Sequence, residues 1–167
     1  MFELIASDNV LPDQIATVIA DLCPGLTIAL LDSDTENADV YFSLTKTDDV
    51  DWPVLIYIST LHPPLSFDTG AVTFAEALHE KLKLDCITDT CGLVFGLDPH
   101  DPYWALAHIN GQWHFASTCG MAIDGPYMDG ETEVAEICKI KLLSEIDLTS
   151  PRPKMYSAES VGVKPQS

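Results

Sequence analysis

The stretch YWALAHINGQWHFAST, residues 103–118, decides how the rest of the sequence is interpreted. Two runs rich in apolar and aromatic residues, Tyr103–Ile109 and Gln112–Thr118, flank the dipeptide Asn110-Gly111. Asn-Gly is the preferred pair for a type I′ turn, because both central residues of that turn need a positive φ. The sequence therefore predicts a β-hairpin with a two-residue turn, so at least part of the sheet is antiparallel.

The turn length also predicts which hairpin residues face each other. His108 should lie opposite Trp113, and Ala107 opposite His114. Because side chains alternate along a strand, His108 and His114 should lie on opposite faces of the sheet. Two histidines placed in this way cannot share one metal ion, which weighs against a zinc site in the hairpin.

Upstream of the hairpin, the pattern of apolar residues predicts strands and two helices. Pro12 suits a first helical turn, and Pro24-Gly25 ends the helix that follows. A second helix is expected from Thr73 to Leu84, with a capping box formed by Thr73 and Glu76. The expected extended segments are 2–6, 26–31, 39–44, 54–58 and 86–95.

The C-terminal third is harder to interpret. Residues 131–146 fit either a helix or a strand, and we favour the helix because Val134, Cys138 and Leu142 have helical spacing. The expected fold class is α+β: one globular domain over residues 1–149, a mixed or mainly antiparallel sheet and two or three helices. Residues 150–167 are expected to form a flexible tail.

Charge is the most unusual property of the composition. Between Met1 and Pro151 there is no arginine, and 25 acidic residues face five lysines, so the charge of this part is −20. A small domain needs a net charge of only about 2–8 to stay dissolved. The larger charge costs folding free energy through self-repulsion. We therefore expect that its negative potential serves to attract another macromolecule.

The acidic residues are clustered, and a cluster gives a stronger local potential than even spacing, because salt screens charges more than about 8 Å apart. Three clusters lie beside aromatic residues on loops stiffened by proline or glycine. Interfaces favour Tyr, Trp and Met as anchors, with charges at the rim. The residues expected to contact a partner are Asp48, Asp49, Asp51, Trp52, Asp98, Asp101, Tyr103, Asp124, Tyr127 and Asp129.

A thiol- or metal-dependent enzyme is the main alternative. Cys91 or Cys119 would act with His100 or His114, although the cysteine and histidine spacing fits none of the strong zinc patterns. Residues 32–43 begin like a calcium loop but lack its glycine and its final glutamate. We therefore predict no cofactor and no resident metal.

The remaining features limit location and partners. The five cysteines are odd in number and scattered, which favours reduced thiols in the cytoplasm. We expect neither a signal peptide nor a membrane span, and direct nucleic-acid binding is disfavoured because phosphate contacts need Lys and Arg.

The sequence thus favours a non-enzymatic acidic binding protein, most simply an immunity or inhibitor protein that blocks the cationic site of a basic toxin or enzyme. The chain resembles bacterial immunity proteins in size and charge alone. A secretion chaperone or adaptor for a basic effector is a further alternative. Oligomeric state stays open.

Overall fold

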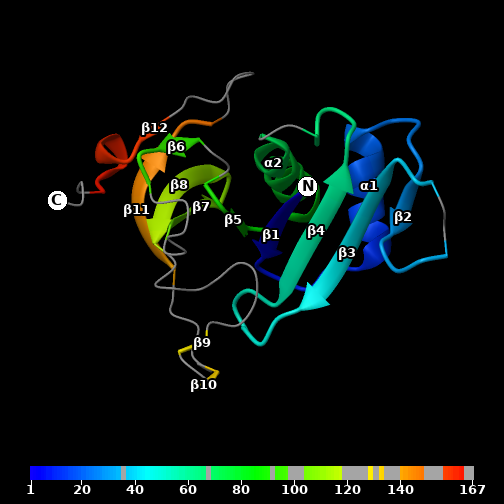
Figure 1. The fold of residues 1–167 in the computed structure, drawn as a ribbon, viewed down its shortest axis with the longest axis horizontal. Coiled ribbons are helices and arrows are strands. Elements are labelled where there is room, and N and C mark those ends of the chain that lie inside the picture. The colour runs from blue at the N-terminus through cyan, green and yellow to red at the C-terminus, as the bar shows by residue number, and fades with distance from the viewer. Residues whose placement is uncertain are drawn as a thin grey trace.

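The computed structural model describes residues 1–34, 37–66, 69–90, 93–97, 104–117, 128–129, 132–133, 140–148 and 156–163. Within these ranges the chain forms two α-helices, α1 (Pro12–Leu22) and α2 (Gly70–Leu82), and a mixed eight-stranded sheet. The predicted α+β class is confirmed. Across the sheet the order is β11 (Lys141–Ile146), β8 (Gln112–Ser117), β7 (Trp104–Ile109), β5 (Cys86–Thr88), β1 (Phe2–Ala6), β4 (Val54–Thr60), β3 (Val40–Lys46) and β2 (Ile28–Leu30) (Figure 1).

Strand β1 lies near the middle of this sheet. It pairs with β4 on one side and with β5 on the other, both antiparallel. Every neighbouring pair in the large sheet is antiparallel except β2 and β3, which are parallel. Two short pairs lie outside it: β9 (Met128–Asp129) with β10 (Thr132–Glu133), and β12 (Tyr156–Ser157) parallel to β6 (Val94–Phe95).

The hairpin forms as predicted. Asn110 and Gly111 have φ values of 49° and 82°, the positive values that a type I′ turn requires. His108 faces Trp113 and Ala107 faces His114, so the two histidines lie on opposite faces of the sheet. Local sequence alone specified this element, because its register depends only on the turn.

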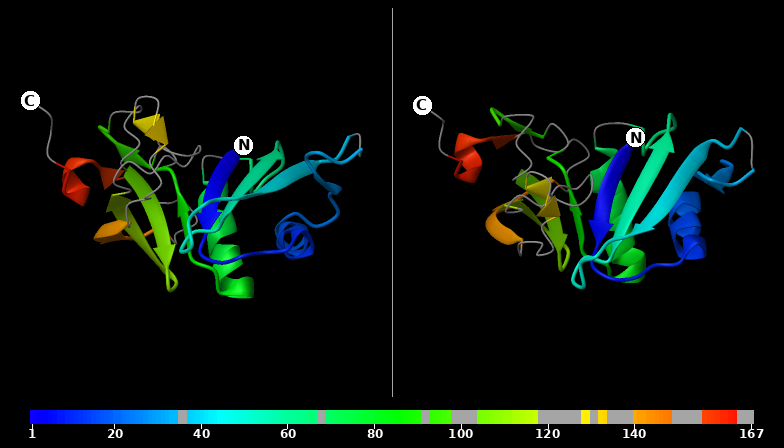
Figure 2. Two further views of the ribbon diagram at one scale, coloured as in Figure 1. Left: turned by 90° about the horizontal axis from the view of Figure 1, so that it is seen from below. Right: turned by 60° about the horizontal axis from the view of Figure 1, so that its bottom comes forward.

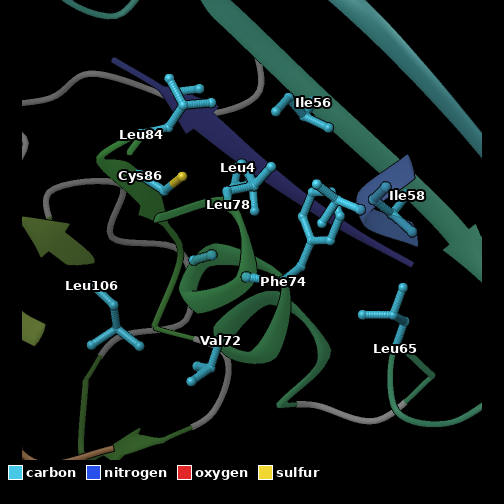
Figure 3. Close-up of a cluster of buried hydrophobic side chains, with 14 of the residues drawn as sticks. Leu4, Ile56, Ile58, Leu65, Val72, Phe74, Leu78, Leu84, Cys86 and Leu106 are labelled. Atoms are coloured by element: carbon cyan, nitrogen blue, oxygen red, sulfur yellow. The ribbon is translucent and has the colours of Figure 1, made fainter. Parts of the chain in front are cut away.

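The main core lies between one face of the sheet and the two helices. Helix α2 contributes Val72, Phe74 and Leu78 to this core, and Phe74 and Leu78 lie toward Leu4 of β1 (Figure 3). Helix α1 buries the apolar stripe expected from its sequence, namely Ile15, Val18 and Ile19. A smaller apolar cluster covers the other face of the sheet.

The start of α2 differs from the prediction. The helix begins at Gly70 with Thr69 as its N-cap, so Thr73 lies inside the helix and the expected capping box with Glu76 is wrong. The Glu76 carboxylate instead accepts a hydrogen bond from the Trp113 indole at 3.0 Å. Local spacing could not reveal a partner that lies on another strand.

The helix favoured for residues 131–146 is also wrong in the described part. Residues 132–133 form β10, and Lys141–Ile146 forms β11, which pairs with β8 along the edge of the sheet. A β-bulge between Leu142 and Ser144 shifts the register there. The bulge breaks the simple alternation of the strand after Leu142.

Part of the segment expected to be a flexible tail packs against the domain. Tyr156 pairs with Val94 in β12, and the backbone N–H of Tyr156 donates to the Leu93 carbonyl at 2.7 Å. A short 3-10 helix, η1 (Glu159–Val161), follows, and Val161 is buried in the main core.

A glycine-to-alanine change tests how closely the start of α2 packs against the backbone of Leu65. A methyl group on Gly70 would collide with the Leu65 carbonyl oxygen. In an open helix this change stabilises by up to about 1 kcal/mol. Here we expect G70A to lower the free energy of unfolding by about 1–3 kcal/mol in urea titrations, because the packed backbone must shift.

Thr73→Ala is the matched control in the same helix. Because Thr73 caps nothing, T73A should change the free energy of unfolding by less than about 0.7 kcal/mol. If T73A lowered the free energy of unfolding by about 1 kcal/mol or more, Thr73 would have to cap the helix, which would contradict the observed helix start.

Candidate functional site

The register of the sheet brings several acidic loops to one end. Ala6 at the end of β1 lies between Val54 at the start of β4 and Cys86 at the start of β5. The hairpin turn and the end of β11 follow at the same level, since Cys86 faces His108 and Trp113 faces Ile146. We call this the acidic end, and its aspartates are Asp8, Asp48, Asp49, Asp51, Asp85 and Asp147.

The acidic end collects loops that are far apart in sequence. The β1–α1, β3–β4 and α2–β5 connections and the hairpin turn lie toward the bottom of both views in Figure 2. The ends of β4, β1 and β5 belong to adjacent strands, and strands are about 4.8 Å apart. The register therefore brings aspartates from three separate parts of the sequence to one end of the sheet. Two lysines, Lys46 and Lys83, flank the same end.

The β3–β4 loop carries exposed residues at the acidic end. The side chain of Asp49 folds back into the loop, where its Oδ1 accepts hydrogen bonds from the backbone N–H groups of Asp51 at 2.7 Å and Trp52 at 3.3 Å. The exposed Asp48 and Asp51 flank Val50, which is 91% exposed. The loop therefore presents an apolar side chain between carboxylates.

A second apolar side chain lies on the connection that follows β1. Leu11, at the start of α1, is 67% exposed. Its backbone N–H donates to the side chain of Gln14, which fixes the chain direction at this point. Asp8 and Asp13 lie before and after it in the same connection and first helical turn. Leu11 and Val50 were not singled out from the sequence, because Pro12 predicted a helix start beside Leu11 and the aspartates around Val50 predicted a turn.

Trp52 is the aromatic residue of this loop that was expected to contact a partner. Its side chain is partly buried and packs on the smaller core cluster, which includes Ile5 and Ile87. Its backbone carbonyl accepts a hydrogen bond from the Thr47 hydroxyl. Trp52 thus supports the loop that presents Val50.

Most of the other predicted contact residues lie outside the described residues. These are Asp98, Asp101, Tyr103, Asp124 and Tyr127. Asp129 is described only by its backbone, in β9. The structure therefore unites Asp48, Asp49, Asp51 and Trp52 in one loop and places that loop beside Asp8 and Asp85.

The residues of the alternative enzyme are only partly described. Cys91, Cys119 and His100 lie outside the described residues, and His114 is a partly buried residue of β8. The described cysteines, Cys23 and Cys86, are buried thiols, and burial raises the pKa of both. A raised pKa disfavours the thiolate that a nucleophile needs. The described ranges contain no cluster of three metal-binding side chains.

The opposite end of the sheet contains a carboxylate–imidazole pair. Asp39 Oδ1 lies 3.5 Å from His62 Nε2, and Asp39 Oδ2 accepts hydrogen bonds from the backbone N–H and the hydroxyl of Thr27, each at 2.9 Å. These two hydrogen bonds, with a smaller contribution from His62, lower the pKa of Asp39. The group ties the start of β3 to the segment before β2, which is a structural role.

A buried polar cluster was missed by sequence reasoning. Glu76 and His79 of α2 face the hairpin, where Glu76 bonds to Trp113 and the His79 ring meets the His108 ring edge-on, with centroids 5.3 Å apart. Burial raises the pKa of Glu76, although the indole hydrogen bond partly offsets this effect. The sequence did hold one signal for this cluster. His108 and Trp113 share one face of the hairpin, and their polar atoms need partners when that face is buried.

Comparison with known proteins adds no assignment. No family model, curated protein or solved structure matches the chain. A helix of the length and apolar character needed to cross a bilayer is absent from the part of the chain that the structure describes.

The geometry of the β3–β4 loop predicts different roles for its three aspartates. Asp49→Ala removes the acceptor of two backbone hydrogen bonds, so we expect a loss of about 1–2 kcal/mol in the free energy of unfolding. The exposed Asp48→Ala and Asp51→Ala should each stay within about 0.5 kcal/mol of the wild type in the same urea titrations. Equal effects of all three changes would contradict the folded-back position of Asp49.

Proposed function

We propose that this chain is an acidic binding protein that uses the acidic end of its sheet to hold a basic protein partner. The observation that carries the proposal is the exposed β3–β4 loop, where Val50 projects between Asp48 and Asp51. An apolar centre with charged residues around it is the usual composition of a protein interface.

Electrostatics supports a cationic partner. The four lysines among the described residues are Lys46, Lys81, Lys83 and Lys141. One of them, Lys81, is paired with Asp21 away from the β3–β4 loop. The remaining carboxylates greatly outnumber the lysines, so the field of the acidic end attracts cations and repels nucleic acid.

An immunity or inhibitor protein for a basic toxin or enzyme is the version of this function that the charge favours best. A toxin must be captured before it causes damage, and complementary charge raises association rates to about 10⁸–10⁹ M⁻¹s⁻¹ at low salt, from about 10⁵–10⁶ without it. Exposed carboxylates on short loops would enter a cationic cleft and block it.

The test measures binding and inhibition with purified small basic nucleases, and poly-L-lysine serves as a probe of nonspecific attraction. We expect one nuclease to bind one-to-one, to lose its activity, and to associate more slowly as salt rises. Binding without loss of activity would favour a chaperone over an inhibitor. If no nuclease binds at tens of micromolar in low salt more tightly than poly-L-lysine does, the proposal is wrong.

Charge reversal locates the contact on the protein. The double change Asp48→Lys and Asp51→Lys leaves the hydrogen bonds of Asp49 in place, so the fold should persist. We expect stopped-flow measurements at low salt to show association at least tenfold slower, with a smaller change in the dissociation rate, because charge acts mainly on the encounter.

The matched control is Asp32→Lys with Asp34→Lys. This pair changes the net charge by the same amount at two exposed positions beyond β2, at the edge of the sheet. Its association rate should change much less. Equal slowing by both double variants would show that net charge alone is responsible, and an unchanged rate in the first would remove the β3–β4 loop from the site.

A further inference from the structure

Two imidazoles, His108 buried and His79 partly buried, lie between the hairpin and α2. His108 of β7 is 3% exposed, and its ring lies edge-on to the His79 ring. The Nδ1 atoms of both histidines are buried without a hydrogen-bond partner among the described residues. An unpartnered buried polar atom is costly, and such atoms in a native structure call for an explanation.

The cluster joins α2 to both strands of the hairpin. The hairpin rests on His79, since Gly111 lies so near that an added methyl group would be 3.3 Å from His79 Nε2. The ring of His108 lies 4.7 Å from that of Trp113, whose indole donates to Glu76. On the far side of the turn, Asp85 Oδ1 accepts a hydrogen bond from the backbone N–H of Asn110, with 2.9 Å between the oxygen and the nitrogen.

We propose that the His79–His108 pair is an acid-sensitive latch, and that protonation of His108 releases the β7–β8 hairpin from α2. The contacts in the structure suit a neutral His108 ring, because an imidazolium there would be buried beside a second imidazole with little access to water. Histidine is the side chain whose ordinary titration lies in mildly acidic solution.

The titration of His108 supports this direction. Burial is the main cause that lowers the pKa of His108 to about 4, and the neighbouring His79 lowers it further. Asp85 opposes the shift, and His114 on the other face of β7–β8 adds to it. In the released hairpin His108 returns toward its ordinary value of 6.5, so the released state binds more protons between pH 6.5 and about 4.

The sign of the pH dependence follows from this difference. The stabilisation from neutral His108 is fully present above pH 6.5 and is lost as the pH falls toward 4. Uptake of one proton raises the released fraction by up to about tenfold for each pH unit in this window. Glu76 acts oppositely, because its raised pKa favours the docked state as the pH falls. Cys86, opposite His108 in β5, stays a neutral thiol because its pKa is raised.

The experiment follows the full chain from pH 8 to pH 4 by NMR of the imidazole protons and by amide hydrogen exchange. We expect the His108 ring to stay neutral until below about pH 5, and amide protection in β7 and β8 to fall together with its titration. Strands β3 and β4 should keep their protection. Titration of His108 near pH 6.5 without loss of protection, simultaneous loss in all strands, or no change down to pH 4 would each overturn the latch.

Variants separate the contributing groups. E76Q keeps an acceptor for the Trp113 indole and removes the opposing titration, so its release should begin at higher pH. H108Q should abolish the proton-linked release. If H108Q does not fold, the NMR and hydrogen-exchange titration of the wild type still tests the proposal. The control H62Q removes a half-exposed histidine at the other end of the sheet and should leave the hairpin transition unchanged. An unchanged transition in a folded H108Q would also overturn the proposal.

Discussion

The structure depends on one pairing constraint: the first strand of the chain must lie between β4 and β5. Leu4 and Ala6 of β1 are fully buried, and β1 connects the half of the sheet formed by β2, β3 and β4 to the half formed by β5, β7, β8 and β11. Without β1 the sheet would divide into two parts with exposed edges. Helix α2 covers this junction, and its Phe74 and Leu78 fill the space that the pairing creates.

The acidic end is a consequence of that pairing. Asp8, Asp51 and Asp85 are separated widely in sequence, yet each lies beside the end of one of three adjacent strands. Their mutual repulsion costs folding free energy, which the burial of the core around β1 offsets. Some of these carboxylates also maintain the loops: Asp49 closes the β3–β4 loop, and Asp85 holds the hairpin turn.

Elements with strong local signals were predictable. The hairpin register, the strand Phe2–Ala6 and the start of α1 at Pro12 all agree with the structure, because a turn pair, an apolar run and a proline act within a few residues. The start of α2 and the strand β11 were not predictable in this way. Thr73 and Glu76 fit a capping box locally, but the Trp113 indole is the partner of Glu76. The apolar residues that lead into β11 fit a helical period as well as a strand.

The sequence by itself determined the fold class, the hairpin and the excess of negative charge, since these follow from composition and short-range geometry. Only the tertiary structure decided which charges lie together, that Val50 projects while Trp52 packs inward, and that His79 meets His108. Those arrangements depend on contacts between residues far apart in the chain, and the chain's local pattern carries no information about which distant surfaces will be buried against each other.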